Sequence, residues 1–380
     1  DSYAIGDVDG DDSIGENIGG LVGYNEYSSI TNAYANGAVS GNKLVGGLVG
    51  NNNADSSSFV SIDNAYATGK VNGSEGGVGG LVGGVQNGKI TNAYATGDVS
   101  GQVAVGGLIG TVAGPVVNAY ATGDVTGTGT DSEFIGGLLG YSVHRITNAY
   151  ATGTVSGNSD IGGLVGSHLS VWFNSYYATT DADGNAINPT NDSGAGEGKT
   201  YAELTQLSTF GAWGSDIDDQ GGTDAIWRIY DDHSTPLLRS FLTPVAITSL
   251  SDKTYDGDIA SGSTAAYDTD VSNATLDGSL TYATDDANAA TYRTSDNSLT
   301  LSGLFSDQQG YDIRYAGARL DITPRPLSID GTNVDDKVYD GTTDAVVTTG
   351  TLDGLIESEE LGVTASGSFE SANAGQREAI

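Results

Sequence analysis

The chain has 380 residues, 58 of them glycine, and its 14 basic and 49 acidic residues give a net charge of −35. A surface this acidic repels phosphate backbones and anionic lipid head groups, so we expect no nucleic-acid partner and no membrane insertion of this region. The absence of cysteine excludes thiol nucleophiles, disulfides and thiolate metal sites. With no methionine to oxidise either, an extracellular location is expected.

The first half of the chain is a sequence repeat. The string Asn-Ala-Tyr recurs every 26 to 32 residues, and each copy follows a Gly-Gly-Leu block. Glycines separate short β-branched and aromatic runs, so each unit should contain two or three short strands. A unit of this size cannot bury its apolar face alone and must stack on its neighbours. The sequence therefore predicts an all-β fold in which residues 1–180 form a parallel β-helix, or solenoid, of about six rungs.

Identical rungs place identical side chains about 4.8 Å apart. The asparagines are expected to form a ladder of hydrogen-bonded amides: Asn32, Asn64, Asn92, Asn118, Asn148 and Asn174. The tyrosines are expected to form an aromatic ladder: Tyr34, Tyr66, Tyr94, Tyr120, Tyr150 and Tyr176. The ring ladder is either core or an exposed platform on which sugars stack. The sequence does not decide whether the tyrosines or the leucines point inward.

Residues 181–243 are expected to cap the open end of the stack. Large apolar residues are dense there, from Trp213 to Phe241. Thr200 and Glu203 form a capping box, which predicts the start of a short amphipathic helix of about ten residues.

A second repeat follows. The string that begins at Asp252, Asp-Lys-Thr-Tyr-Asp-Gly, returns at Asp336 with Val in place of Thr. Alternating runs broken by Asp, Asn and Gly turns predict small β-sandwich-like modules at residues 244–324 and 325–380, the second incomplete. Each repeated string is expected to form a turn with an exposed ion pair. We expect the chain to be a region of a longer protein.

These motifs carry a family resemblance. The GGLVG block followed by NAYATG resembles the GLUG motif repeat of large bacterial exported proteins, and the DKxYDG strings resemble YDG (MBG-like) repeat modules. This combination is similar to filamentous-haemagglutinin-like surface adhesins. The resemblance implies a bacterial cell-surface or secreted setting and no catalytic residue.

Calcium is the one cofactor for which the sequence offers ligands. Two segments present oxygens at alternate positions, as calcium loops do. The stronger candidate comprises Asp181, Asp183, Asn185 and Asp192, and the weaker comprises Asp7, Asp9 and Asp11. Neither has the glycine that the full twelve-residue pattern needs, and Asp7 also occupies an ordinary rung position.

We expect a non-enzymatic adhesion or structural region, whose partner is a cell-surface glycan, a protein receptor or copies of itself in a filament. The ligand-contacting turns would be residues 51–58, 74–76 and 128–133. An alternative is a carbohydrate-active solenoid that uses Asp98 and Asp124, which stand at equivalent positions of adjacent rungs, near the ~5 Å that retaining glycosidases use. A third possibility is a purely structural stalk.

Overall fold

The computed structural model describes residues 2–11, 13–54, 60–169, 171–263, 266–356 and 359–375. It divides into two compact units. The first comprises residues 1–244 and 305–313, and the second comprises residues 245–304 and 314–380. None of the helices in the described ranges is long and apolar enough to cross a membrane.

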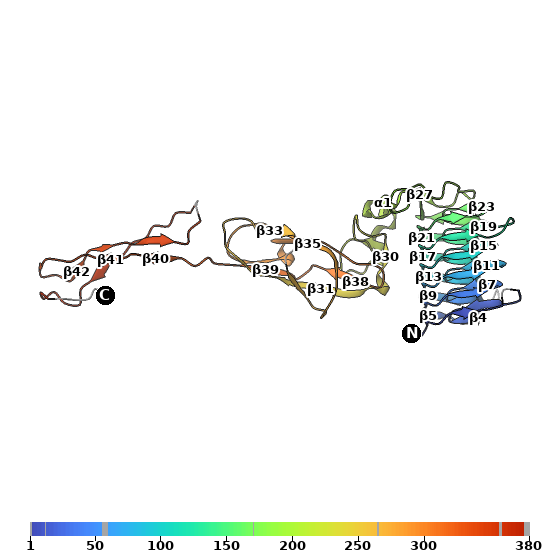
Figure 1. Ribbon diagram of the computed structural model, residues 1–380, viewed down its shortest axis with the longest axis horizontal. Helices are drawn as coiled ribbons and strands as arrows, with labels where there is room; N and C mark the ends of the chain where they lie inside the picture. The colour runs from blue at the N-terminus through green and yellow to red at the C-terminus, as the bar shows by residue number, and fades with distance from the viewer. Residues whose placement is uncertain are drawn as a thin grey trace. The chain divides into compact units, whose positions relative to one another are not determined.

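The first unit contains the predicted parallel β-solenoid, with its coils stacked in Figure 1 from β4 and β5 up to β23. Each coil contributes one strand to each of four parallel sheets, where the sequence predicts two or three strands per unit. The extra strand arises because the paired glycines turn the chain, which splits the Gly-Gly-Leu block between two sheets.

The first sheet carries the Asn-Ala-Tyr segments. Its strands are β1 (Ser2–Ala4), β5 (Ile30–Ala35), β9 (Val60–Ala67), β13 (Gly88–Ala95), β17 (Val116–Ala121), β21 (Ile146–Ala151), β25 (Trp172–Phe173), β26 (Tyr176–Ala178) and β27 (Glu197–Lys199). The second sheet follows it around each coil. Its strands are β2 (Val8–Asp9), β6 (Val39–Gly41), β10 (Val71–Gly73), β14 (Val99–Gly101), β18 (Val125–Gly127) and β22 (Val155–Ser156).

The other two sheets flank the paired glycines. The strands before the glycine corner are β3 (Glu16–Gly19), β7 (Lys43–Gly46), β11 (Gly76–Gly79), β15 (Val103–Gly106), β19 (Glu133–Gly136) and β23 (Ser159–Gly162). The strands after it are β4 (Val22–Glu26), β8 (Val49–Asn53), β12 (Val82–Gln86), β16 (Ile109–Ala113), β20 (Leu139–Ser142) and β24 (Val165–His168).

The interior of the solenoid is aliphatic. The leucines of the Gly-Gly-Leu blocks point inward with the alanines on either side of each tyrosine, and Leu48, Leu81 and Leu108 are fully buried. A Cβ atom on Gly80 would lie 2.1 Å from the carbonyl oxygen of Gly107 in the next coil. Glycine is required there because only a residue without a side chain lets successive coils approach this closely.

The tyrosines point outward, and a second apolar cluster forms on them. We call residues 200–241 the cover. The cover comprises α1 (Tyr201–Leu204), η1 (Leu207–Asp216), β28 (Ile217–Asp218), β29 (Trp227–Arg228), β30 (Leu237–Leu238) and η2 (Arg239–Phe241). Its buried residues, among them Phe210, Trp213 and Trp227, cluster with Tyr94, Tyr120, Tyr150 and Tyr176. The cover therefore lies along the side of the stack.

This placement corrects the expectation that all of residues 181–243 cap the open end. Only the part before the cover continues the stack, because β27 pairs with β26 and Ala195 joins the interior core. The capping box at Thr200 is present, but α1 ends after four residues. Turns of 3-10 helix, interrupted at Phe210 and Gly214, replace the rest of the expected helix.

The second unit begins with a two-sheet module. One sheet contains β31 (Thr243–Leu250), β32 (Lys253–Thr254), β34 (Tyr267–Thr269), β36 (Thr291–Arg293) and β39 (Arg319–Thr323). β38 (Tyr311–Arg314) lies mostly in the 305–313 segment of the first unit. The other contains β33 (Ser261–Ser263), β35 (Asp277–Thr284) and β37 (Leu299–Phe305), and a turn of 3-10 helix, η3 (Thr294–Asp296), precedes β37. Leu280, Leu299 and Leu320 are buried, as the predicted sandwich-like module requires.

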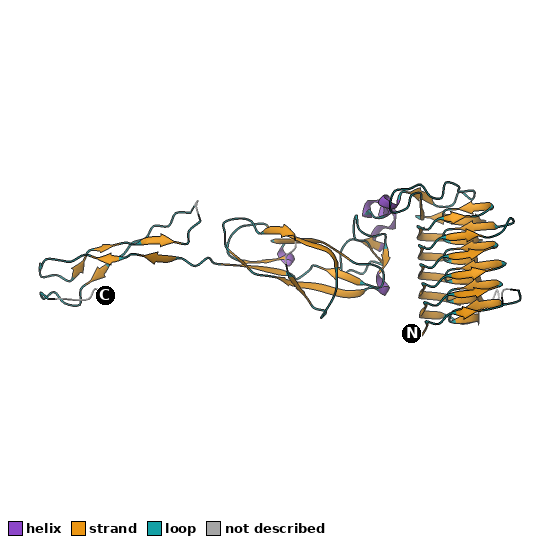
Figure 2. Ribbon diagram, in the orientation of Figure 1, coloured by secondary structure: helices purple, strands orange, loops and turns teal. Residues whose placement is uncertain are grey.

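The region after Ile322 consists of three two-stranded antiparallel ladders, drawn as thin paired strands in Figure 2. They pair β40 (Ser328–Asp330) with β44 (Thr351–Asp353), β41 (Asn333–Val334) with β43 (Val347–Thr348), and β42 (Asp344–Ala345) with β45 (Gly367–Ser368). No described residue from 323 to 375 is buried. Sandwich-like packing is therefore restricted to the first module.

Candidate functional site

The tyrosine ladder is the most regular side-chain array on the surface of the solenoid. Parallel in-register pairing places Tyr66 beside Tyr94 and Tyr120 beside Tyr150. Successive rings from Tyr3 to Tyr150 stack with centroids 4.8–5.1 Å apart and planes within 8° of parallel. Because the rings cover one another's faces, the ladder presents ring edges and hydroxyl groups outward.

The ladder is half covered. Tyr94, Tyr120 and Tyr150 are at most 2% exposed, whereas Tyr3 is 61% exposed and Tyr34 and Tyr66 are partly exposed. The sequence left open whether the tyrosines are core or an exposed platform, and the structure shows that the two halves of the ladder differ. Tyr94, Tyr120 and Tyr150 are core beneath the cover, Tyr3 and Tyr34 are surface, and Tyr66 lies at the boundary, where Phe241 contacts it.

Two kinds of contact close the covered half. The Phe241 ring meets the edges of Tyr66 and Tyr94 at centroid distances of 5.4 and 5.1 Å, nearly perpendicular to both. The Trp227 ring lies 6.1 and 6.0 Å from Tyr120 and Tyr150. Phe241 and Trp227 thus each span two rungs.

The second kind of contact satisfies the tyrosine hydroxyls. Gln309 Nε2 donates to the Tyr94 hydroxyl at 2.7 Å, and the Tyr120 hydroxyl donates to Gln308 Oε1 at 3.0 Å. The Tyr150 hydroxyl donates to the Pro236 carbonyl oxygen at 2.6 Å. Burial raises the pKa of Tyr94, Tyr120 and Tyr150 above the ordinary value, so these hydroxyls stay protonated and act as donors or neutral acceptors.

Gln308 and Gln309 belong to the 305–313 segment, which returns to the first unit from a distant part of the chain. An ion pair fixes this segment to the cover, because Arg239 Nη1 lies 2.6 Å from Asp312 Oδ1. Arg228, which is 2% exposed, lies 3.5 Å from the same oxygen and covers the Tyr230 ring. No sequence pattern predicts this return of the 305–313 segment.

A groove of about 540 Å³ lies where the cover ends. Tyr3, Tyr34 and Tyr66 form part of its lining, together with Phe241 and Gln309 of the covered region. Its remaining lining is Asn32, Ala33, Asn64 and Ser240. The groove is thus a direct continuation of the surface on which the cover packs.

The six asparagines of the predicted amide ladder share a left-handed backbone, with φ between 49° and 54°. The ladder bonds are interrupted. Asn118 Nδ2 donates to Asn92 Oδ1 at 3.2 Å and Asn174 Nδ2 to Asn148 Oδ1 at 3.5 Å, but the buried Oδ1 of Asn64 has no hydrogen-bond partner among the described residues. Asparagine recurs here because it tolerates this backbone better than other side chains do. The recurrence of asparagine could have predicted a left-handed backbone, but the prediction of an amide ladder did not include it.

Asp98 and Asp124, the aspartates that a carbohydrate-active solenoid would use, form hydrogen bonds between successive coils. Asp98 Oδ1 accepts from the backbone amide of Asp124 at 3.1 Å, and Asp124 Oδ1 accepts from that of Thr154 at 2.8 Å. Asp7 makes the equivalent bond to Ala38. Each aspartate bonds the amide at its own position one coil further on, so the column has a structural use.

The calcium candidates are engaged locally. Asp181 accepts from the backbone and side-chain amides of Asn185, and these bonds lower the pKa of Asp181. Asp192 instead accepts from the Ile161 amide on β23, and Asp183 makes no side-chain hydrogen bond within the described residues. In the other segment, Asp9 bonds Ser40 and Asp11 bonds Ser13. No group of three His, Cys, Asp or Glu side chains within the described ranges is arranged to hold a metal, and calcium stays a prediction.

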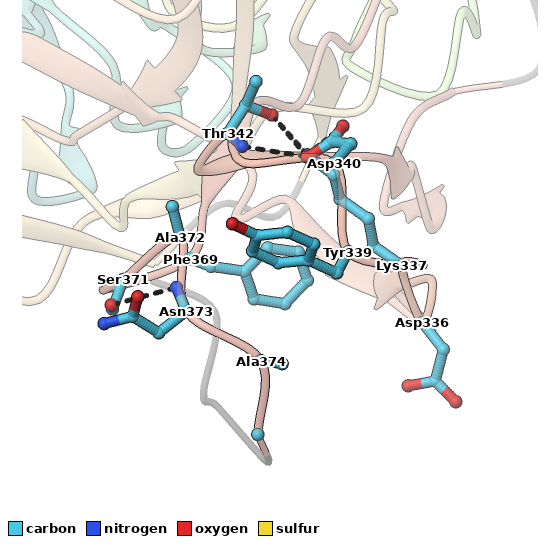
Figure 3. A pocket seen from close by; sticks show the side chains of 11 residues that line it. Asp336, Lys337, Tyr339, Asp340, Thr342, Phe369, Ser371, Ala372, Asn373 and Ala374 are labelled. Carbon is cyan, nitrogen blue, oxygen red and sulfur yellow. Dashed lines mark hydrogen bonds and ion pairs between the residues drawn. The ribbon is translucent and has the colours of Figure 1, made fainter.

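A surface hollow of about 660 Å³ lies in the YDG-like region and is shown in Figure 3. Tyr339 and Phe369 line it beside the repeated turn. In that turn Lys337 Nζ lies 2.9 Å from Asp340 Oδ2 and lowers the pKa of Asp340 to about 2. Lys253 and Asp256 make the same i,i+3 pair at 2.7 Å, so the repeated string forms a turn with an ion pair both times.

Comparison with protein families agrees with this architecture. A family model of the GLUG motif matches residues 14–40 and 74–100, and a model of the YDG domain matches residues 323–380. Each GLUG match runs through one strand of every solenoid sheet, which makes one coil. No curated protein and no solved structure matches the chain. The predicted resemblance is confirmed: the solenoid is similar to the GLUG motif, and the C-terminal region is similar to the YDG domain.

Proposed function

We propose that these residues are a non-enzymatic extracellular region of a large bacterial surface or secreted protein. In this proposal the solenoid binds a cell-surface glycan or protein receptor, and the YDG modules act as a spacer. The region remains outside the membrane and binds no nucleic acid. Its acidic surface keeps such exposed modules soluble.

One observation carries the proposal. The repeated positions serve the fold: glycines at corners, leucines inside, asparagines at left-handed turns and aspartates between coils. The segments between the repeats differ in length and sequence. This division is typical of a scaffold that presents variable surfaces.

The variable segments are residues 74–76, residues 128–133 and residues 51–58, of which 55–58 lie outside the described residues. Thr130 and Asp131 are exposed in the second of these. They are the first positions to vary because no core residue depends on them.

The experiment is binding of the labelled full chain to intact host cells and to a glycan array, with and without EDTA. We expect saturable binding that weakens in the double variant Thr130→Ala, Asp131→Ala. The matched control, Thr349→Ala with Glu360→Ala, alters two exposed residues of the YDG-like region and should bind as the unaltered chain does. Loss of binding in EDTA would support a bound calcium ion.

An absence of binding to cells and glycans would overturn the adhesive proposal. The chain would then be a stalk or filament subunit, which sedimentation of the full chain over a concentration series would detect as self-association.

A further inference from the structure

The uncovered rungs of the tyrosine ladder have the same chemistry as the covered ones. Tyr34 stacks on Tyr66 at 4.8 Å with planes 1° apart, as closely as any pair beneath the cover. Ring edges and hydroxyls therefore point into the groove in the same arrangement that Phe241, Trp227, Gln308 and Gln309 recognise further along.

The cover shows which partner this surface accepts. Phe241 spans Tyr66 and Tyr94, and Trp227 spans Tyr120 and Tyr150, so one aromatic ring serves each pair of rungs. Within the described residues, the next pair in this series, Tyr3 and Tyr34, contacts no ring other than those of the ladder. Ring edges carry partial positive charge and favour the face of an incoming aromatic ring.

Hydrogen bonds to the tyrosine hydroxyls are the second feature by which the cover recognises the ladder. A glutamine or a backbone carbonyl meets each buried tyrosine hydroxyl. The hydroxyls of the uncovered rungs are equally able to donate and accept. An acidic partner is disfavoured because the chain has a net charge of −35.

We propose that the groove over Tyr3, Tyr34 and Tyr66 docks an uncharged polypeptide loop of a partner protein, which lays one aromatic ring across the edges of two rungs and offers a carboxamide to a tyrosine hydroxyl. The groove continues the surface that the cover already occupies, since Ser240 and Phe241 of the cover line it. Flat stacking of sugar rings is not favoured, because the tyrosine faces within the ladder cover one another.

The test uses the full chain and a capped, fluorescein-labelled heptapeptide, Gly-Gln-Ser-Phe-Leu-Gln-Gly, in a polarisation titration. A second peptide with alanine in place of phenylalanine is the ligand control. We expect saturable binding of the first peptide, weakened by about tenfold or more when phenylalanine is replaced. A photoreactive phenylalanine analogue in the same peptide should crosslink to the segments around Tyr3 and Tyr34.

Two variants locate the site. Ser240→Trp fills the groove from the cover side without altering the ladder, and Tyr34→Ala removes a ring. Both should weaken binding by about tenfold or more. Tyr24→Ala removes a half-exposed tyrosine on β4 that lies outside the groove lining and should leave binding unchanged. Circular dichroism of each variant checks that the fold is retained.

Binding that ignores Ser240→Trp, or that does not need the aromatic residue, would overturn the proposal. So would preferential binding of cellohexaose in the groove, or self-association abolished by Ser240→Trp, which would identify a glycan or a second copy as the occupant. The inference goes beyond the adhesive proposal. If the unaltered chain binds cells but does not bind the peptide, the ladder site alone is refuted.

Discussion

The asparagine of each Asn-Ala-Tyr segment is chosen by backbone conformation first and by its amide second. Asn118 has φ 54°, is 5% exposed and donates one hydrogen bond to Asn92. A left-handed backbone costs an ordinary L-residue ~1–2 kcal/mol. A typical hydrogen bond contributes ~1 kcal/mol. The backbone contribution therefore equals or exceeds that of the ladder bond.

Asn118→Ala should lower the free energy of unfolding by ~2–3 kcal/mol, because it loses the bond and strains the backbone. Asn118→Gly loses the same bond without the strain and should cost less. Urea denaturation of both variants measures the difference. If glycine destabilises the chain as much as alanine does, the amide ladder and not the backbone selects asparagine.

The aspartate column gives a second prediction at this scale. Asp124→Ala removes the acceptor for the Thr154 amide and should lower the stability by ~1 kcal/mol. Asp124→Asn keeps a side-chain oxygen at that position and should retain most of the stability. Thermal unfolding compares the two, and equal stability of Asp124→Ala and the unaltered chain would show that the bond contributes nothing.

At the scale of elements, the cover is held by a few large aromatic side chains on the tyrosine ladder. Trp227 is fully buried and contacts Tyr120 and Tyr150. Trp227→Ala should cost ~3–5 kcal/mol, the usual range for removing a buried large aromatic side chain. Phe173→Ala, at a ring that is 49% exposed, is the control and should cost far less. Similar urea midpoints for the two variants would contradict burial beneath the cover.

The buried hydroxyls make the stability depend on alkaline pH. Burial raises the pKa of Tyr94, Tyr120 and Tyr150 in the folded chain. Their contribution is fully present below the unfolded value of about 10 and is lost as the pH rises, because the unfolded chain ionises first. Urea midpoints should therefore fall between about pH 9 and about pH 11. A constant midpoint across that range would mean that these rings ionise freely in the folded state.

Sequence periodicity was enough to predict the solenoid and its tyrosine stack, because the same short apolar and aromatic segments recur in every coil. The placement of the cover was not predictable from the same reasoning. The density of apolar residues from Trp213 to Phe241 shows that this segment must bury something, but an end and a side of the stack both offer apolar surface. The return of Gln308 and Gln309 to Tyr120 and Tyr94 depends on tertiary contacts that no local pattern encodes.

At the scale of the whole molecule, the net charge of −35 opposes compaction. Salt screens this repulsion, since the Debye length falls from about 30 Å at 0.01 M to about 10 Å at 0.1 M. The melting temperature should therefore rise over this range of sodium chloride. A melting temperature that falls would show that surface ion pairs such as Lys337 with Asp340 outweigh the net repulsion.

The central claim is that one tyrosine ladder is closed by the chain's own cover at Tyr94, Tyr120 and Tyr150 and open at Tyr3 and Tyr34, with Tyr66 at the boundary beside Phe241. Nitration of the native full chain, followed by peptide mass spectrometry, tests it most directly. The account predicts rapid modification of Tyr3 and Tyr34, slower modification of Tyr66 beside Phe241, and protection of the three covered tyrosines until the chain unfolds. Equal rates for all six would contradict the half-covered ladder and remove the basis of the proposed docking site.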